Sequence, residues 1–320
     1  MILEIVVTHW TEPWELVQKG FMMLASQRLV DWSKVKVTLI HDGTPCYPDE
    51  YFEAFCPFTV HQVSLEHCGI AAVRNYAIEH STAEWIKFND CDDTFSSLYA
   101  VHQIMDALKG AQKYDLLWFN VYAEVDGVAH IKDERDPVVI HGKLFRRSFL
   151  NEHDLRFPEF LTWCEDSAFL AIMEMEIDHE KIGRIVTQQP IYAWIARQGS
   201  LCNRKEIRFK NLQSFFDRHC FVADEFKKRN LTDQYNTMCV RVMCDSYYTL
   251  CRAPGIDEDK SAHEARVWTW YSEHKDAIDA CRPEMFDMVI EAVNKECNDG
   301  GWMSKHDVQN WIRKHERSVE

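Results

Sequence analysis

Three carboxylates lie close together at Asp90, Asp92 and Asp93, directly after the largely apolar stretch 85–89. The stretch predicts a buried strand, and alternate side chains of an extended chain share a face, so Asp90 and Asp92 are expected to point the same way. Two carboxylates on one face repel each other unless a cation lies between them. Oxygen ligands suit Mg²⁺ or Mn²⁺, which also bind phosphate oxygens. The cluster therefore predicts a divalent metal site, with a solvated acidic turn as the simpler alternative.

Strands and helices alternate in the sequence around these acids. Four short apolar stretches predict buried strands: 2–7, 35–40, 59–63 and 85–89. Thr11 and Pro13 indicate a helix start between the first two, with Thr11 as its N-cap. Strand, helix and strand within about forty residues favour parallel strands, whose ligands bind at the carboxyl ends. Asp42 ends the second strand and so joins the same edge, although an Asp-Gly turn alone explains that pair.

A helix is expected to begin at Gly69, with Ile70, Val73 and Ala77 on its apolar face. Arg74 lies one step off that face and near the helix start. An arginine there is suited to bind a base, a ribose or a phosphate. An ordinary surface arginine is the alternative.

The order of these pieces resembles the nucleotide-sugar-dependent glycosyltransferases of family 2, which have the GT-A fold. The matching segments are Asp42-Gly43-Thr44, Gly69 with Arg74-Asn75, and Asp90-x-Asp92-Asp93. Further along, segments 142–147, 155–158 and 164–169 resemble bacterial capsule and cell-wall polysaccharide enzymes. The resemblance covers residues 1 to about 203.

The resemblance implies roles for the residues that match. Asp42 would contact the base, Asp90 the ribose, and Asp92 a divalent metal on the diphosphate, with Asp93 sharing or replacing that last role. Thr8 at the end of the first strand and Arg74 would complete the nucleotide pocket. The metal would be Mn²⁺ or Mg²⁺.

Two residues of the second half also receive roles from the resemblance. Asp166, in the pair Glu165-Asp166, matches the family's general base, which takes the proton of an acceptor hydroxyl. The same pair is also a good helix start, because carboxylates favour a helix N-terminus. Arg197 would reach the diphosphate, or it is a surface arginine. Here Trp194 replaces an aromatic tyrosine of the family pattern.

The expected fold class is α/β, with two parts. Residues 1–203 would form a GT-A (Rossmann-like) domain whose mixed, mostly parallel sheet is flanked by helices. One strand is expected over 115–123, with Asp126-Gly127 as a hairpin turn, and another over 188–194. Residues 204–320 show helical periodicity and would form a helical subdomain, which is a candidate for shaping the acceptor site or a homo-oligomer interface.

Composition narrows the class of protein. The chain has 320 residues, 46% of them hydrophobic, and a net charge of −15, which disfavours broad electrostatic capture of nucleic acid or of anionic membranes. The scattered cysteines form no Cys-x-x-Cys pair, and the N-terminus lacks a signal peptide, so a cytoplasmic protein with reduced thiols is expected. No apolar stretch reaches the ~18 residues that a transmembrane helix needs.

The sequence thus predicts a metal-dependent, inverting glycosyltransferase of the hexosyltransferase type that uses a nucleoside-diphosphate sugar, favouring UDP. One alternative is a sugar-1-phosphate nucleotidyltransferase, which would need a glycine-rich phosphate loop after the first strand, and residues 7–13 lack one. The other is an inactive nucleotide-sugar-binding protein. The acceptor is open among a glycan, a protein, a lipid-linked sugar and nucleic acid.

Overall fold

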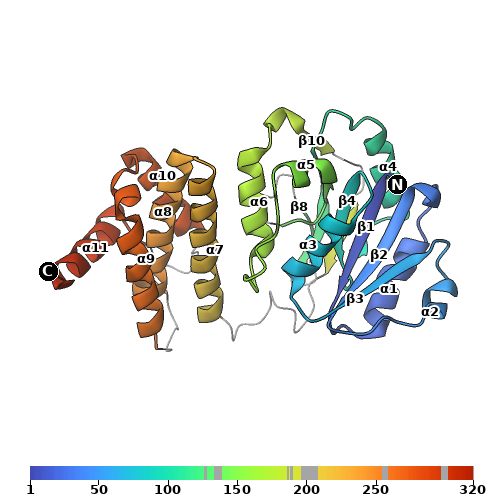
Figure 1. Cartoon of the computed structure of the whole chain (residues 1–320), viewed down its shortest axis with the longest axis horizontal. Coiled ribbons are helices and arrows are strands. Elements are labelled where there is room, and N and C mark those ends of the chain that lie inside the picture. The colour runs from blue at the N-terminus through green and yellow to red at the C-terminus, as the bar shows by residue number, and fades with distance from the viewer. Residues whose placement is uncertain are drawn as a thin grey trace. The chain divides into compact units, whose positions relative to one another are not determined.

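The computed structural model describes residues 1–125, 128–132, 139–185, 187, 190–195, 208–253, 259–296 and 302–319. The chain forms two compact units, Met1–Arg204 and Lys205–Glu320, each described by itself below. Figure 1 traces both units along the sequence. The predicted turn at 126–127 and Arg197 lie outside the described residues.

A seven-stranded sheet forms the centre of the first unit. Its strands are β1 (Leu3–His9), β2 (Val35–Asp42), β3 (Val60–Leu65), β4 (Trp85–Asp90), β6 (Leu116–Phe119), β9 (Lys143–Arg146) and β10 (Ile182–Ile185). The spatial order is β10-β6-β9-β4-β1-β2-β3. Only β9 runs antiparallel to its neighbours. The predicted mixed, mostly parallel sheet is confirmed.

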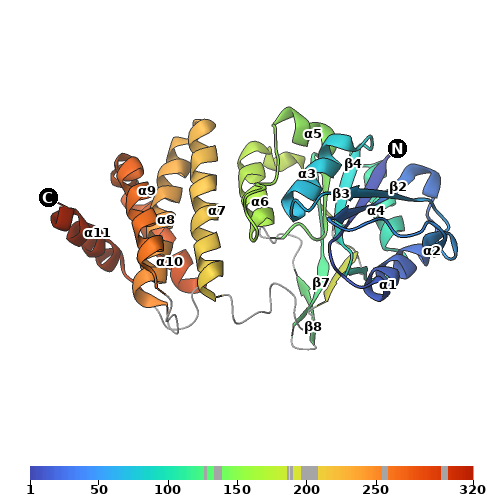
Figure 2. The same cartoon turned by 60° about the horizontal axis from the view of Figure 1, so that its bottom comes forward.

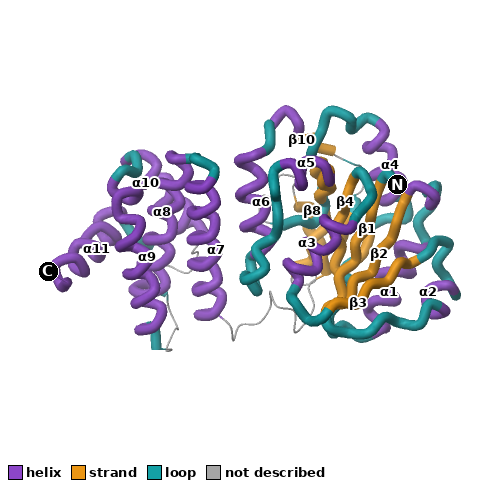
Figure 3. Tube along the Cα trace, viewed as in Figure 1, coloured by secondary structure: helices purple, strands orange, loops and turns teal. Residues whose placement is uncertain are grey.

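Helices cover this sheet, as Figure 3 shows by colour. They are α1 (Trp14–Ala25), α2 (Glu50–Glu53), α3 (Ile70–His80), α4 (Ala100–Lys109), α5 (Arg147–Glu152) and α6 (Glu165–Glu176), with the 3₁₀ turns η1 (Trp32–Lys34) and η2 (His179–Lys181). Apolar side chains of α1 and α4 share one buried cluster with Leu3, Ile5 and Val7 of β1. The N-cap of α1 is Pro13, so the expectation of Thr11 as N-cap is wrong.

The single strand expected over 115–123 is wrong, because the chain changes sheet at Asn120. Residues before Asn120 form β6, and those after it form β7 (Val121–Val125) in a second sheet. Asn120 holds this break: its carbonyl accepts the Ile191 N–H at 3.2 Å, and its side-chain oxygen accepts the Thr187 hydroxyl at 2.8 Å. These partners are far away in the sequence, so the local pattern does not show the break.

The second sheet has the order β5-β11-β7-β8. Its other strands are β5 (Thr94–Phe95), β8 (Val128–Lys132) and β11 (Tyr192–Ile195). Figure 2 shows β7 and β8 side by side, and they pair antiparallel as a hairpin requires. β11 lies between β5 and β7, which brings its first residue, Tyr192, next to the acidic segment that precedes β5.

The second unit is helical. It contains α7 (Arg208–Lys228), α8 (Thr232–Tyr247), the π-helical turn η5 (Tyr248–Arg252), α9 (Ser261–Asp279), α10 (Pro283–Glu296) and α11 (Lys305–Val319). Its buried apolar residues form a separate cluster that includes Val240, Val267 and Val293. Among the residues with described positions, no helix combines the length and the apolar character that a membrane crossing requires.

Candidate functional site

Asp90 lies at the carboxyl end of β4, as predicted, with two polar partners. Its Oδ1 accepts hydrogen bonds from the Thr8 hydroxyl at 3.1 Å and from Arg74 Nη2 at 3.3 Å. Burial acts to raise the pKa of Asp90, but the Arg74 guanidinium is the main group that outweighs it and lowers that pKa below its usual value. The structure therefore keeps Asp90 ionised at the sheet edge, next to Thr8 from β1 and Arg74 from α3.

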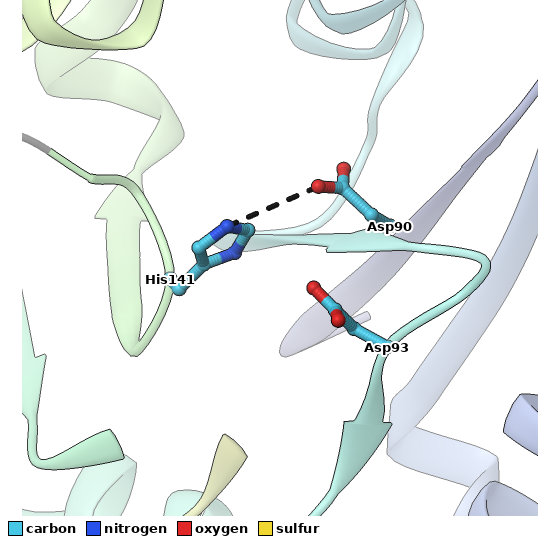
Figure 4. A group of neighbouring side chains, drawn as sticks. All are labelled: Asp90, Asp93 and His141. Carbon is cyan, nitrogen blue, oxygen red and sulfur yellow. Dashed lines mark ion pairs between the residues drawn. The ribbon is translucent and has the colours of Figure 1, made fainter. Parts of the chain in front are cut away.

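Asp90, Asp93 and His141 form a group that could hold a metal ion. One ligand atom from each residue lies within 4.8 Å of the others. Figure 4 shows the three side chains facing a common point, with His141 Nε2 3.9 Å from Asp90 Oδ2. Burial lowers the pKa of His141 to about 4, so its imidazole is neutral at pH 7 and keeps a lone pair for a ligand bond.

The donor set of this group fits a divalent cation. Two carboxylates and one neutral imidazole match Mn²⁺ well, and Mg²⁺ if water completes the shell. His141 Nδ1 is buried and has no hydrogen-bond partner among the residues that the structure describes. A buried polar atom without a partner is costly, so a ligand or water at that atom is physically reasonable.

The structure does not bring Asp92 into this group. The alternation of side chains along β4 does not extend to Asp92, because the strand stops at Asp90. A turn begins there, in which the Asp93 N–H donates to the Asp90 carbonyl at 3.2 Å. This turn carries Asp93, and not Asp92, back beside Asp90. The role of Asp92 as a metal ligand stays a prediction, and Asp93 is the acid that the geometry favours.

Sequence reasoning missed His141, whose position depends on the glycine that follows it. Gly142 has φ +76°, and a Cβ there would lie 2.4 Å from Val121 Cγ1 and 2.6 Å from the Phe119 carbonyl oxygen. Only glycine permits this close approach in that backbone region. The His-Gly pair directly before β9 is the one sequence signal that points to it.

Arg74 joins the end of β4 to the start of α6. Its Nη1 donates to Glu165 Oε1 at 2.7 Å, while its Nη2 reaches Asp90. The side chain is 3% exposed, and its guanidinium lies 5.4 Å from the centre of the Phe157 ring. Arg74 is thus a buried cation shared by two acids, and not the surface arginine that was its alternative interpretation.

Asp166 occupies the first turn of α6, directly after Glu165. Its Oδ1 accepts the N–H of Ser167 at 2.7 Å. Cys164 precedes the helix with a left-handed φ of +66°, which sets the direction of this turn. Burial, and then the neighbouring Glu165, raise the pKa of Asp166 to about 7. A carboxylate with that pKa can accept a proton near neutral pH.

Asp42 is engaged by the loop that leads into α3. Its Oδ1 accepts the Cys68 N–H at 2.7 Å, and its Oδ2 accepts the Gly69 N–H at 3.1 Å and lies 3.0 Å from His67 Nδ1. The contact of Asp42 with a base therefore stays a prediction.

Near Asp42, the ring of Trp10 stacks on the ring of His67 with 5.5 Å between ring centres, and Trp10 is 48% exposed. Such a ring offers a surface for a planar ligand.

Comparison with known proteins gives matches in both sequence and structure. A family model described as "Glycosyl transferase family 2" matches residues 4–180. EpsH of Bacillus subtilis (strain 168) is 27% identical over 160 residues, an alignment that spans 42% of this chain and 45% of that protein.

Solved structures of S. aureus TarS share the fold. TarS 1–349 in complex with UDP has a TM-score of 0.64 at 14% identity. The match covers 100% of this chain and 92% of the TarS chain. The complex with UDP-GlcNAc has a TM-score of 0.63 at 16% identity, with 100% and 93% covered. At these identities the likeness shows the fold alone.

Proposed function

Because the chain belongs to glycosyl transferase family 2, we propose that it transfers a sugar from a nucleoside-diphosphate sugar to an acceptor hydroxyl. The observation that carries the proposal is the pairing of two different acidic centres in one unit. The first is the group Asp90, Asp93 and His141, and the second is Asp166, with Arg74 and Glu165 between them. A uridine donor is favoured because the TarS structures contain UDP or UDP-GlcNAc.

The donor would bind at the carboxyl ends of β1, β2 and β4. Asp90, Asp93 and His141 would hold Mn²⁺ or Mg²⁺, with Asp92 as a further ligand. When bound, such an ion supplies positive charge to the diphosphate as it leaves. Thr8 and Arg74 keep Asp90 in place, and the exposed face of Trp10 would stack on the base beside Asp42.

The acceptor would be activated by Asp166. Its carboxylate takes the proton of the acceptor hydroxyl while the acceptor oxygen forms a bond to the anomeric carbon. The bond from that carbon to the diphosphate oxygen breaks in the same step, so one displacement inverts the anomeric configuration. The raised pKa of Asp166 suits a general base, because proton transfer is most efficient when the pKa of the base lies near the working pH.

The two alternative functions find less support. A nucleotidyltransferase would need phosphate-binding backbone after β1, but residues 10–13 lead directly into α1 with Pro13 as N-cap. An inactive binding protein would not need a half-buried carboxylate with a raised pKa. The family membership favours transfer over both.

The test is release of UDP from UDP-GlcNAc or UDP-glucose, with Mn²⁺ and with EDTA. We expect activity with Mn²⁺ only, a ~10²- to 10⁴-fold loss in Asp166→Asn with donor binding kept, and loss of donor binding as well in Asp93→Asn. Asp178→Asn is the matched control, because within the described part of the chain its carboxylate accepts only the Glu180 N–H, at the start of η2. Equal loss of donor binding in Asp93→Asn and Asp166→Asn would contradict the division of roles.

Two further measurements address the mechanism and the alternative. The anomeric coupling of the product in an NMR spectrum reports inversion or retention, and retention would exclude the single displacement. Release of pyrophosphate from UTP and a sugar phosphate would favour the nucleotidyltransferase instead.

A further inference from the structure

The hydroxyl of Tyr192 contacts both ends of the acidic turn. The hydroxyl donates to Asp93 Oδ2 at 2.6 Å, and its own oxygen lies 3.5 Å from the Asp90 N–H, which points toward it as a donor. Tyr192 is fully buried, so water does not compete for this hydroxyl. One hydroxyl therefore fixes where the turn returns Asp93 relative to the end of β4.

The ring of Tyr192 contacts the third member of the metal-binding group. The imidazole of His141 stacks on it with 4.8 Å between ring centres and 12° between planes. The Lys87 ammonium lies 4.4 Å from the centre of the same ring, where a cation–π contact is favourable. Tyr192 thus touches Asp93 through its hydroxyl and His141 through its ring.

A rigid element places this tyrosine. Tyr192 is the first residue of β11 and pairs with Phe95 of β5 on one side and Val121 of β7 on the other. Lys87 is itself held, because its Nζ donates to the Asn89 side chain and to the Phe88 carbonyl. The position of Tyr192 is therefore set by its pairing with two strands of the second sheet, and Lys87 of β4 packs against its ring.

We propose that Tyr192 is a positioning residue that holds Asp93 and His141 in place for the divalent cation. The inference rests on the metal site of the proposed function and adds a residue that is not itself a ligand. A hydroxyl on one carboxylate oxygen fixes the direction of the other, and a stacked ring fixes the plane of the imidazole. Groups that orient metal ligands in this way typically change metal affinity 10–100-fold when they are removed.

Tyr192→Phe isolates the hydroxyl, since it keeps the ring that contacts His141 and Lys87. We expect Mn²⁺ to bind about 10-fold more weakly, as measured from the EPR signal of free Mn²⁺ in a titration of purified, nucleotide-free protein. Tyr192→Leu removes the ring as well and should weaken Mn²⁺ binding further. Binding is normalised to the folded, monodisperse fraction from gel filtration, so a loss of folded protein is not counted as a loss of affinity.

Tyr271→Phe is the matched control. Tyr271 is also buried and donates its hydroxyl to a carboxylate, Glu316, at 2.9 Å, but in the helical unit. If Tyr192→Phe keeps wild-type Mn²⁺ affinity, or if Tyr271→Phe loses as much Mn²⁺ affinity, the role of Tyr192 is refuted and the proposed metal site is left standing. A wild-type protein that binds no Mn²⁺ would instead contradict the proposed metal site, and the inference with it.

Discussion

Replacement of Gly142 by alanine should reduce both stability and metal affinity, by amounts that the geometry allows us to separate. The backbone at Gly142 has φ +76°, where an alanine is strained by about 1–3 kcal/mol. Its Cβ would also meet Val121 Cγ1 at 2.4 Å and the Phe119 carbonyl oxygen at 2.6 Å. Overpacking of this kind costs about a further 1–3 kcal/mol.

Gly69→Ala supplies the matched comparison in the same unit. Gly69 also has a positive φ, +86°, but a Cβ there has nothing within 4 Å. Gly69→Ala should therefore show the strain alone, and Gly142→Ala the strain together with the steric overlap. The difference in free energy between the two variants should be about 1–3 kcal/mol. In a unit of this size that corresponds to a melting temperature about 2–12 °C lower for Gly142→Ala.

Differential scanning calorimetry and Mn²⁺ titration of both variants make the comparison. Because relief of the overlap must move the chain next to His141, Gly142→Ala should also bind Mn²⁺ more weakly, while Gly69→Ala should not. Equal melting temperatures would refute the close approach at Gly142. A destabilised Gly142→Ala with wild-type Mn²⁺ affinity would refute the link between this turn and the position of His141.

Three further predictions concern Asp166 and the cation Arg74. Burial and Glu165 raise the pKa of Asp166 to about 7, so the rate of sugar transfer should increase as the pH rises through about 7. Steady-state rates measured across this pH range should lose the increase in Asp166→Asn. The folded state then binds this proton more tightly than the unfolded one, so Asp166 lowers stability progressively as the pH rises from about 4 to about 7, and thermal melts of Asp166→Asn should lack that slope. Arg74→Met leaves Glu165 and Asp90 without their shared cation and should lower the free energy of unfolding by about 3–5 kcal/mol, as measured in urea melts. The double variant Arg74→Met/Glu165→Met should recover part of that loss. No recovery would contradict the pairing of Arg74 with Glu165.

The first four strands of the main sheet, β1 to β4, could be predicted from the sequence because each is a short stretch rich in apolar residues. That pattern also placed Asp90 and Asp42 at the ends of their strands, where the structure has them. The helix from Gly69 was predictable for the same reason, since its apolar spacing and its opening glycine are local signals.

The remaining features depend on contacts between distant residues. Tyr192 reaches Asp93 across 99 positions, and Arg74 reaches Glu165 across 91. The choice of Asp93 over Asp92 follows from a turn that begins where β4 ends, and periodicity cannot show that end point. His141 owes its position to Gly142, whose need for glycine arises from the main chain of Phe119 and the side chain of Val121.

The sharing of Arg74 between Asp90 and Glu165 also constrains how the chain can acquire its fold. A nascent chain that has left the ribosome only as far as α5 already contains β1 to β4 and α3. At that stage the Arg74 guanidinium can pair with Asp90 but not yet with Glu165. The part of the first unit that would bind the nucleotide therefore lacks one acidic partner of Arg74 until the start of α6 has been synthesised and docked. A polypeptide cut between α5 and α6 should recover its structure only when both pieces are mixed.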